Sequence, residues 1–176
     1  MQDKYTLNVS IKWENCTLRS WLNSTFLNDA FSEAEQDMIP TTHLTNPKNL
    51  MTNVAGGNNT DDKIFLLGLS DVYGENTNYS AGHWYFNKAA DRIAYATKYT
   101  VVNRSFAYAY LDGGNTRCNA RNYQINRCLV VWWLRSPGYI TYDAASVIKG
   151  GAVNHGNSDN HVAYVFGVRP ALWVQY

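Results

Sequence analysis

The strongest constraint on the fold is an uninterrupted apolar run at residues 129–134, which reads Leu-Val-Val-Trp-Trp-Leu. Branched and aromatic residues at this density are typical of a strand, and the Ser-Pro-Gly turn at 136–138 ends it. Alternate residues of a strand face opposite sides, so at most one of Trp132 and Trp133 can face solvent. This run predicts the main strand of a β-sheet.

Further strands are predicted after this run. Residues 145–148 and 152–153 flank a Lys-Gly-Gly turn and predict a hairpin. Residues 162–166 and 168–174 predict a terminal strand pair. The strand signals are therefore concentrated late in the chain.

Helical patterns come earlier. Leu18, Trp21, Leu22 and Phe26 recur with the i, i+3, i+4, i+8 spacing of one helical face, and Asn15 is the expected N-cap. This pattern predicts that Trp21 belongs to the core. Truncating Trp21 to Ala would then cost about 3 to 5 kcal/mol of folding free energy.

The segments between these patterns complete the fold prediction. Ser32-Glu33-Ala34-Glu35 matches the capping box and predicts a short helix that stops before Pro40. The remaining expectations are a long loop over 41–62, a strand over 64–67, a helical turn over 70–73 and a third helix capped by Asn87. Helices before strands indicate an α+β fold, and the length fits one domain spanning residues 1–176.

Composition excludes several classes of protein. The chain has 176 residues, 14% of them aromatic and 16% charged, which is unlike a disordered segment. A net charge of +1 argues against a surface that coats nucleic acid. No apolar run approaches the roughly 20 residues of a membrane span, and residues 1–7 lack the pattern of an export signal. We therefore expect no nucleic-acid partner and no membrane insertion, and assign no compartment.

Three cysteines, Cys16, Cys118 and Cys128, show no spacing of a zinc site. An odd count leaves at least one thiol free. Cys118 and Cys128 bracket a polar segment and could pair. Without an export signal, however, we favour three unpaired thiols.

No catalytic motif is present, neither a nucleophile elbow nor a phosphate-binding or dinucleotide-binding loop. His155 and His161 lie near Asp159 and could hold a metal, but solvated loop histidines are the commoner case. The acidic pair at 61–62 favours a turn and cap over a catalytic dyad. We therefore expect no catalytic residue, no metal and no cofactor, and predict that the chain is not an enzyme.

Separated motif blocks carry a resemblance to a known family. They are Trp-Glu-Asn-Cys-Thr-Leu-Arg-Ser-Trp-Leu-Asn at 13–23, Trp-Trp-Leu-Arg-Ser-Pro-Gly at 132–138, Gly-Val-Arg-Pro-Ala-Leu-Trp at 167–173, and the linking block at 61–67. Together they resemble a domain of unknown function that is common in gut Firmicutes and their phages. That family is similar in turn to the C-type-lectin-like fold of formylglycine-generating enzymes and of variable proteins diversified by retroelements.

The resemblance implies a mixed, mostly antiparallel twisted sheet, two main helices near the N-terminus, long loops and a ligand-binding role. Members begin with one or two further strands upstream of the first block, whereas only residues 5–13 precede it here, which favours an abbreviated domain or a fragment. Arg135 and Arg169 belong to the blocks, and we predict that both arginines tie carbonyls and carboxylates together within the scaffold.

The candidate ligand surface lies within residues 139–164, where Tyr, Asn, Asp, Ser, His and Gly predominate. Tyr offers a large stiff contact area, and the small polar residues supply adaptable hydrogen bonds, as in antibody paratopes. In the retroelement-diversified proteins, adenine-directed mutagenesis yields such a set. An ordinary Gly/Asn loop pair explains the composition equally well. The candidate contacts are Tyr139, Tyr142, Asp143, Asn154, His155, Asn157, Asp159, Asn160, His161 and Tyr164.

Two function classes stay open, with a third if the chain is a fragment. The first is a binding module for a protein or carbohydrate ligand at a cell or phage surface, with a second Tyr-rich stretch over 106–110 and 119–123 lining the same surface. The second is an oxidase related to the formylglycine-generating enzymes, which would need Cys118 and Cys128 as reactive thiols. The third is a structural domain of a larger surface or tail protein. We favour the binding module.

Overall fold

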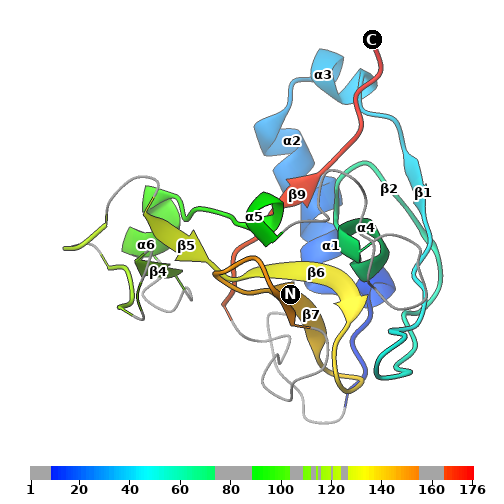
Figure 1. The fold of residues 1–176 in the computed structure, drawn as a ribbon. Helices are drawn as coiled ribbons and strands as arrows, with labels where there is room; N and C mark the ends of the chain where they lie inside the picture. The colour runs from blue at the N-terminus through cyan, green and yellow to red at the C-terminus, as the bar shows by residue number, and fades with distance from the viewer. Residues whose placement is uncertain are drawn as a thin grey trace.

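The computed structural model describes residues 9–73, 89–103, 109–111, 114, 116–119, 121–123, 127–154 and 165–176. It has the predicted α+β class, with short helices and small, mostly antiparallel sheets. Figure 1 shows that most elements pack around one long strand, whereas a smaller group stands apart from them. We call this smaller group, the described part of residues 96–130, the lobe, and the rest of the described chain the body.

The bounds of the helices are given first and those of the strands second, each in chain order. The helices are the 3-10 turn η1 (Trp13–Asn15), α1 (Thr17–Trp21), the π-helical turn η2 (Leu22–Phe26), α2 (Leu27–Ala30), α3 (Glu33–Asp37), α4 (Leu69–Tyr73), α5 (Ala89–Arg92) and α6 (Lys98–Asn103). The strands are β1 (Thr42–Leu44), β2 (Thr60–Asp62), β3 (Phe65–Leu66), β4 (Ala109–Leu111), β5 (Cys128–Val130), β6 (Trp132–Pro137), β7 (Ala144–Val147), β8 (Val153–Asn154) and β9 (Pro170–Ala171).

The first helix is continuous through α1, η2 and α2, which follow one another with helical backbone angles. Its middle turn is π-helical, which inserts an extra residue and displaces the side chains that follow. Leu22 and Leu27 are therefore both buried. Trp21 is 45% exposed and contacts Phe26 with ring centroids 5.2 Å apart. The prediction that Trp21 belongs to the core is wrong, because the buried stripe of this helix runs through Leu22 and Leu27.

Of the two predicted helix N-caps, the structure contradicts one and confirms the other. Asn15 is not the N-cap of α1, because it ends η1, and its side-chain oxygen accepts the Lys12 amide at 2.9 Å. The capping box is confirmed. The Ser32 amide donates to the Glu35 carboxylate at 2.8 Å, and the Glu35 amide donates to the Ser32 hydroxyl at 3.4 Å.

The segment predicted as a loop over 41–62 contains two strands. β1 and β2 pair antiparallel with His43 opposite Asp61. In the loop between the two strands, the backbone at Gly56 lies close to the backbone at Asn46. A Cβ on Gly56 would come within 2.2 Å of the Asn46 carbonyl oxygen. The prediction missed these strands because they are three residues each and consist mainly of polar residues.

Several of the predicted strands and short helices further along are confirmed with changes in length. β3 and α4 lie within 64–67 and at 69–73, and α5 begins at Ala89, while its proposed cap Asn87 lies outside the described residues. β6, β7 and β8 form a three-stranded antiparallel sheet, as the hairpin prediction requires. β9 pairs with β3 in place of the predicted partner over 162–166, of which 162–164 lie outside the described residues.

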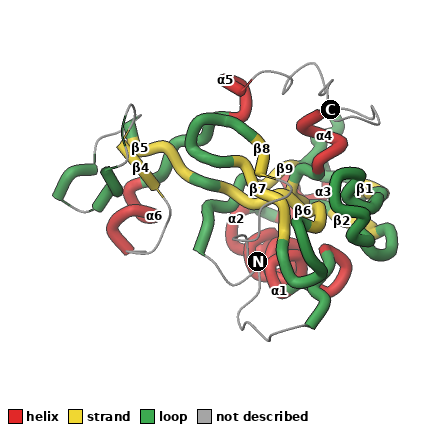
Figure 2. Tube along the Cα trace, turned by 60° about the horizontal axis from the view of Figure 1, so that its bottom comes forward, coloured by secondary structure: helices red, strands yellow, loops and turns green. Residues whose placement is uncertain are grey.

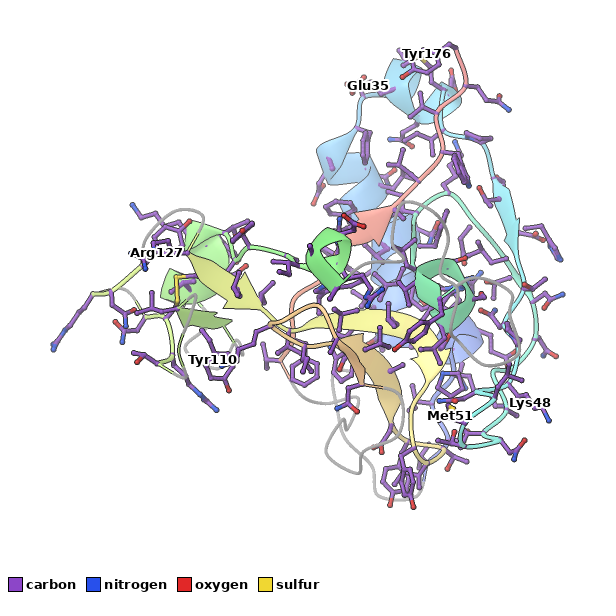
Figure 3. The ribbon with its side chains drawn as sticks, viewed as in Figure 1. Glu35, Lys48, Met51, Tyr110, Arg127 and Tyr176 are labelled. Atoms are coloured by element: carbon purple, nitrogen blue, oxygen red, sulfur yellow. A yellow bond between two sulfur atoms is a disulfide. The ribbon has the colours of Figure 1, made fainter. Side chains whose placement is uncertain are left out.

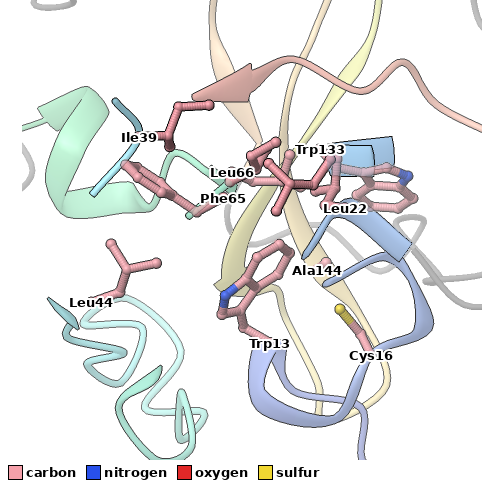
Figure 4. Close-up of a cluster of buried hydrophobic side chains, with 11 residues drawn as sticks. Trp13, Cys16, Leu22, Ile39, Leu44, Phe65, Leu66, Trp133 and Ala144 are labelled. Carbon is pink, nitrogen blue, oxygen red and sulfur yellow. The ribbon is translucent and has the colours of Figure 1, made fainter. Parts of the chain in front are cut away.

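Both faces of β6 are buried. Trp133 packs in a cluster with Trp13, Leu22 and Leu66, and Figure 4 shows these side chains converging from the helices, β3 and β6. Trp132, on the opposite face, packs with Leu69 and other residues of a second cluster. Each tryptophan is 1% exposed, so neither faces solvent. β6 therefore lies between the two buried clusters of the body.

The lobe has its own small core of Ala96, Val101, Cys118, Cys128 and Val130. β4 and β5 pair antiparallel within it, and Figure 2 shows this pair beside α6 at a distance from the body helices. Cys118 and Cys128 form a disulfide, whereas Cys16 is free and buried. The favoured prediction of three unpaired thiols is wrong, because β5 brings Cys128 against the segment that carries Cys118. Among the described residues, no helix combines the length and apolar composition that crossing a bilayer demands.

Candidate functional site

Residues 138–143 form the turn between β6 and β7, which we call the aromatic tip. The Gly138 amide donates to the Asp143 carbonyl at 3.0 Å and closes the turn. From outside, the Ile11 amide donates to the Thr141 carbonyl at 3.0 Å. One bond within the turn and one from a segment distant in the sequence thus hold the aromatic tip in one conformation.

A second distant segment anchors the aromatic tip through Asn49. Its side-chain amide donates to the carbonyls of Pro137 at 2.9 Å and Gly138 at 3.2 Å, and the Thr52 hydroxyl donates to Gly138 at 2.9 Å. Asn49 is 0% exposed, so water does not compete for these bonds. The anchoring loop is itself a tight turn, in which Asn53 has a φ of 59°.

Large side chains surround the anchored turn. Tyr139 is 49% exposed and Tyr142 is half-buried. Leu50 and Met51 follow the anchoring Asn49 directly, and they are 40% and 58% exposed. Figure 3 labels Met51 on the lower side of the body, well away from Arg127 in the lobe. This end of the molecule therefore presents aromatic and aliphatic groups on a fixed backbone.

The structure brings only part of the predicted ligand surface together. Tyr139, Tyr142 and Asp143 share the aromatic tip, but Asp143 is 0% exposed, and its side chain lies against Gly138. Asp143 therefore does not face solvent as a ligand contact must. Asn154 lies elsewhere, on β8 opposite Ser146, and is half-buried. The other predicted contacts lie outside the described residues, namely His155, Asn157, Asp159, Asn160, His161 and Tyr164.

Sequence reasoning missed the anchoring loop. Residues 41–62 carried the general signal that a long loop is either functional or loosely ordered. No local pattern links Asn49 to Pro137, because the contact depends on the tertiary fold. Leu50 and Met51 were therefore not predicted as part of the surface.

Asp62 is a buried structural residue. Its carboxylate accepts the Trp13 indole N–H at 2.9 Å, the Arg19 Nε–H at 2.7 Å and the Thr60 hydroxyl at 2.9 Å. Its neighbour Asp61 is exposed and pairs with the exposed His43 at 2.7 Å. Both residues lie on β2, so the predicted turn and cap is wrong, and the pair joins separate elements instead.

Arg135 has the predicted scaffold role. Its guanidinium donates to the Leu66 carbonyl at 2.8 Å and to the Asp71 carboxylate, and so ties β6 to β3 and α4. Gly68 leaves room for it, because a Cβ there would lie 3.0 Å from the guanidinium carbon. Arg169 lies over the Trp132 ring at 5.2 Å, and burial lowers the pKa of Arg169 from its ordinary value.

Among the described residues, no three His, Cys, Asp or Glu side chains gather in a way that could hold a metal ion. No curated protein and no solved structure matches the chain. One family profile, described as a domain of unknown function, matches residues 2–176. The chain therefore belongs to the DUF6273 family, a domain of unknown function.

Proposed function

We propose that this domain is a ligand-binding module on a C-type-lectin-like scaffold, and that the aromatic tip contacts a protein or carbohydrate ligand. The observation that carries the proposal is the fixed display of Tyr139 on a turn bonded to two separate segments. Tyr139 is 49% exposed, while the backbone of the aromatic tip is bonded to Ile11, Asn49 and Thr52.

Preorganisation explains why such a surface suits binding. An exposed side chain on a loose loop loses conformational entropy when a ligand fixes it, which weakens binding. Tyr has few rotatable bonds, and the aromatic tip is already ordered by hydrogen bonds that include the buried amide of Asn49. Most of the contact energy of Tyr139 would therefore contribute to affinity.

The scaffold part of the proposal has its own support. All described strand pairs are antiparallel, but the bridge between Trp132 and Gly167 is parallel, as in a mixed sheet. The long helix and α3 both lie near the N-terminus. We further propose that the chain is a variable protein of a diversity-generating retroelement, on the composition of residues 139–164.

The oxidase alternative has less support. It requires Cys118 and Cys128 as reactive thiols in an accessible site. Their sulfurs are joined in a disulfide, and the residues are 9% and 1% exposed within the small core of the lobe. This arrangement favours a structural role for the disulfide.

The binding proposal is tested with a glycan array and a display library of bacterial surface proteins. We expect at least one ligand whose Kd rises about tenfold or more in Tyr139→Ala, the loss typical of a binding hot spot. Tyr99→Ala is the matched control, because Tyr99 is 68% exposed but lies on α6 in the lobe. Absence of any ligand, or equal binding by both variants, would overturn the proposal.

The retroelement proposal has a separate test. The DNA beside the gene should encode a reverse transcriptase and a near-identical repeat of the segment for residues 139–176 that differs only at adenines. Absence of the repeat would leave a binding module of fixed sequence.

A further inference from the structure

The segment that forms the lobe, residues 96–130, has a larger positive net charge than the whole chain. The net charge of the chain is only +1. Residues 96–130, however, contain five basic residues and one acidic residue, namely Lys98, Arg104, Arg117, Arg121 and Arg127 against Asp112. One carboxylate can neutralise one cation, so the sequence of residues 96–130 leaves a positive excess however its charged groups pair with one another. Such an asymmetry points to an anionic partner.

The described cations of the lobe are at its surface. Lys98, Arg117, Arg121 and Arg127 are all exposed. Figure 3 shows Arg127 and Tyr110 on the lobe, on the opposite side of the molecule from Lys48 and Met51. The charge therefore faces a direction different from that of the aromatic tip.

A groove marks where this surface meets the body. It has a volume of about 370 Å³ and is lined by Tyr110, Val131, Ile148 and Lys149. The Lys149 ammonium lies 4.7 Å from the centroid of the Tyr110 ring, and the Arg117 guanidinium carbon lies 6.0 Å from the same centroid. Two cations thus flank one aromatic ring beside apolar walls.

Lys149 also joins the lobe to the body. It belongs to the turn between β7 and β8, and its ammonium donates to the carbonyl of Gly114 in the lobe at 2.6 Å. The groove is therefore held between two parts of the chain that the sequence separates.

These groups select the chemistry of a ligand. An aromatic ring and apolar side chains such as Ile148 can pack against the C–H faces of sugar rings. Lys and Arg bind carboxylate and phosphate groups. The disulfide of the lobe is of the kind that persists in oxidising surroundings outside the cytoplasm, where polysaccharides are accessible polyanions and nucleic acids are not the usual partners.

We propose that the lobe binds an acidic polysaccharide, with one sugar unit in the groove at Tyr110 and its acidic group against Lys149 and Arg117. Neighbouring acidic units then meet the other exposed cations of the lobe. This site is separate from the aromatic tip and does not rest on the function proposed for it.

The test measures binding of the full chain, with its disulfide intact, to immobilised polygalacturonate. The matched neutral probe is polygalacturonate with its carboxylates methyl-esterified. We expect binding to the acid form that weakens between 0.15 and 1 M NaCl, since added salt shortens the screening length from about 8 to about 3 Å. The ester form should not bind.

Variants locate the site. Arg117→Gln with Lys149→Gln should raise the Kd by about tenfold or more. Lys48→Gln removes one cation on the opposite side of the molecule and should leave the Kd unchanged. Thermal melts of the variants verify that the chain remains folded.

Several results would overturn the proposal. They are equal binding of the acid and ester forms, equal loss in Lys48→Gln and in the groove variant, and tighter binding of single-stranded DNA than of any acidic polysaccharide. Failure of polygalacturonate, alginate and a poly(glycerol phosphate) polymer to bind would also overturn it. None of these results bears on binding at the aromatic tip, so the two proposals fail independently.

Discussion

The body and the lobe solve the same problem of burial at different scales. The body has a cluster of eleven buried residues that includes Trp133 on one face of β6, and a second cluster that includes Trp132 on the other. Among the described residues of the lobe, the buried cluster has five members, most of them small, and a disulfide joins two of them. A small core cannot repay the entropy of ordering its chain, and small folds commonly add covalent links. The comparison teaches that, within one chain, covalent crosslinking is used where packing is insufficient.

The largest effect should follow from removing a tryptophan of the body. Trp133→Ala leaves a cavity beside Trp13 and Leu22, and we expect a loss of about 3 to 5 kcal/mol in the free energy of unfolding. Chemical denaturation measures this loss. Trp21→Ala is the control, and because Trp21 is 45% exposed, its loss should be much smaller. Equal losses would mean that the π-helical turn does not turn Trp21 out of the core.

The buried ion pair of the body gives the next effect. Asp62→Ala leaves the Trp13 indole, the Arg19 guanidinium and the Thr60 hydroxyl without their acceptor. We expect a loss of about 3 kcal/mol, the lower end of the range for a broken buried pair, because the side chain of Arg19 is 26% exposed. Asp61→Ala removes an exposed partner of His43 and should cost below about 0.5 kcal/mol. Similar losses for the two neighbours would contradict the role of Asp62.

The disulfide tests whether the lobe depends on its crosslink. Cys118→Ser with Cys128→Ser should destabilise the lobe by about 3 kcal/mol. Faster amide exchange should appear in β4, β5 and α6, while the exchange of β6 and β7 stays slow. Uniformly faster exchange through β6 would mean that the two regions unfold as one.

Thiol counting checks the same crosslink chemically. Unfolding without reductant should expose one reactive thiol, that of Cys16, and unfolding with reductant should expose all three cysteines. In the folded chain, burial raises the pKa of the Cys16 thiol and shields it from reagents. Three thiols without reductant would show that the crosslink does not form.

The smallest effect concerns the capping box of α3. Hydrogen bonds from the Ser32 hydroxyl and amide lower the pKa of Glu35. The stabilisation is therefore fully present above the ordinary pKa of a glutamate and is lost as the pH falls through the lowered value in the folded chain. Ser32→Ala should cost about 1 kcal/mol at neutral pH and should flatten this acid dependence. Ser24→Ala, on an exposed serine outside the cap, should leave the acid dependence unchanged.

The features predicted from the sequence are those encoded by neighbouring residues. The capping box at Ser32 and Glu35, the strand at Trp132 and the hairpin of β7 and β8 each depend on contacts within a few positions. Cys118 and Cys128 show the limit, because their spacing allowed a bond but the strand pairing of the lobe decided it.

The candidate surface divides in the same way. Tyr139 and Tyr142 could be predicted, since their composition and their place after a turn are local signals. Asn49 and Met51 could not, because their position beside the aromatic tip depends on a contact between β1–β2 and the end of β6. The excess of basic residues in the lobe is visible in the sequence. The net charge of the whole chain does not show it, because acidic residues elsewhere in the chain offset it.

The pairing of β3 with β9 has a consequence for synthesis on the ribosome. Phe65 pairs with Ala171, and Phe166 covers Trp133 with ring centroids 4.3 Å apart. Contacts so distant in sequence form late, because a long intervening loop must close first. The core of the body therefore cannot be completed until residues 166–171 have left the ribosomal exit tunnel. During that interval the nascent chain presents the aromatic face of β6 to the cell, a substrate for chaperones and a seed for aggregation.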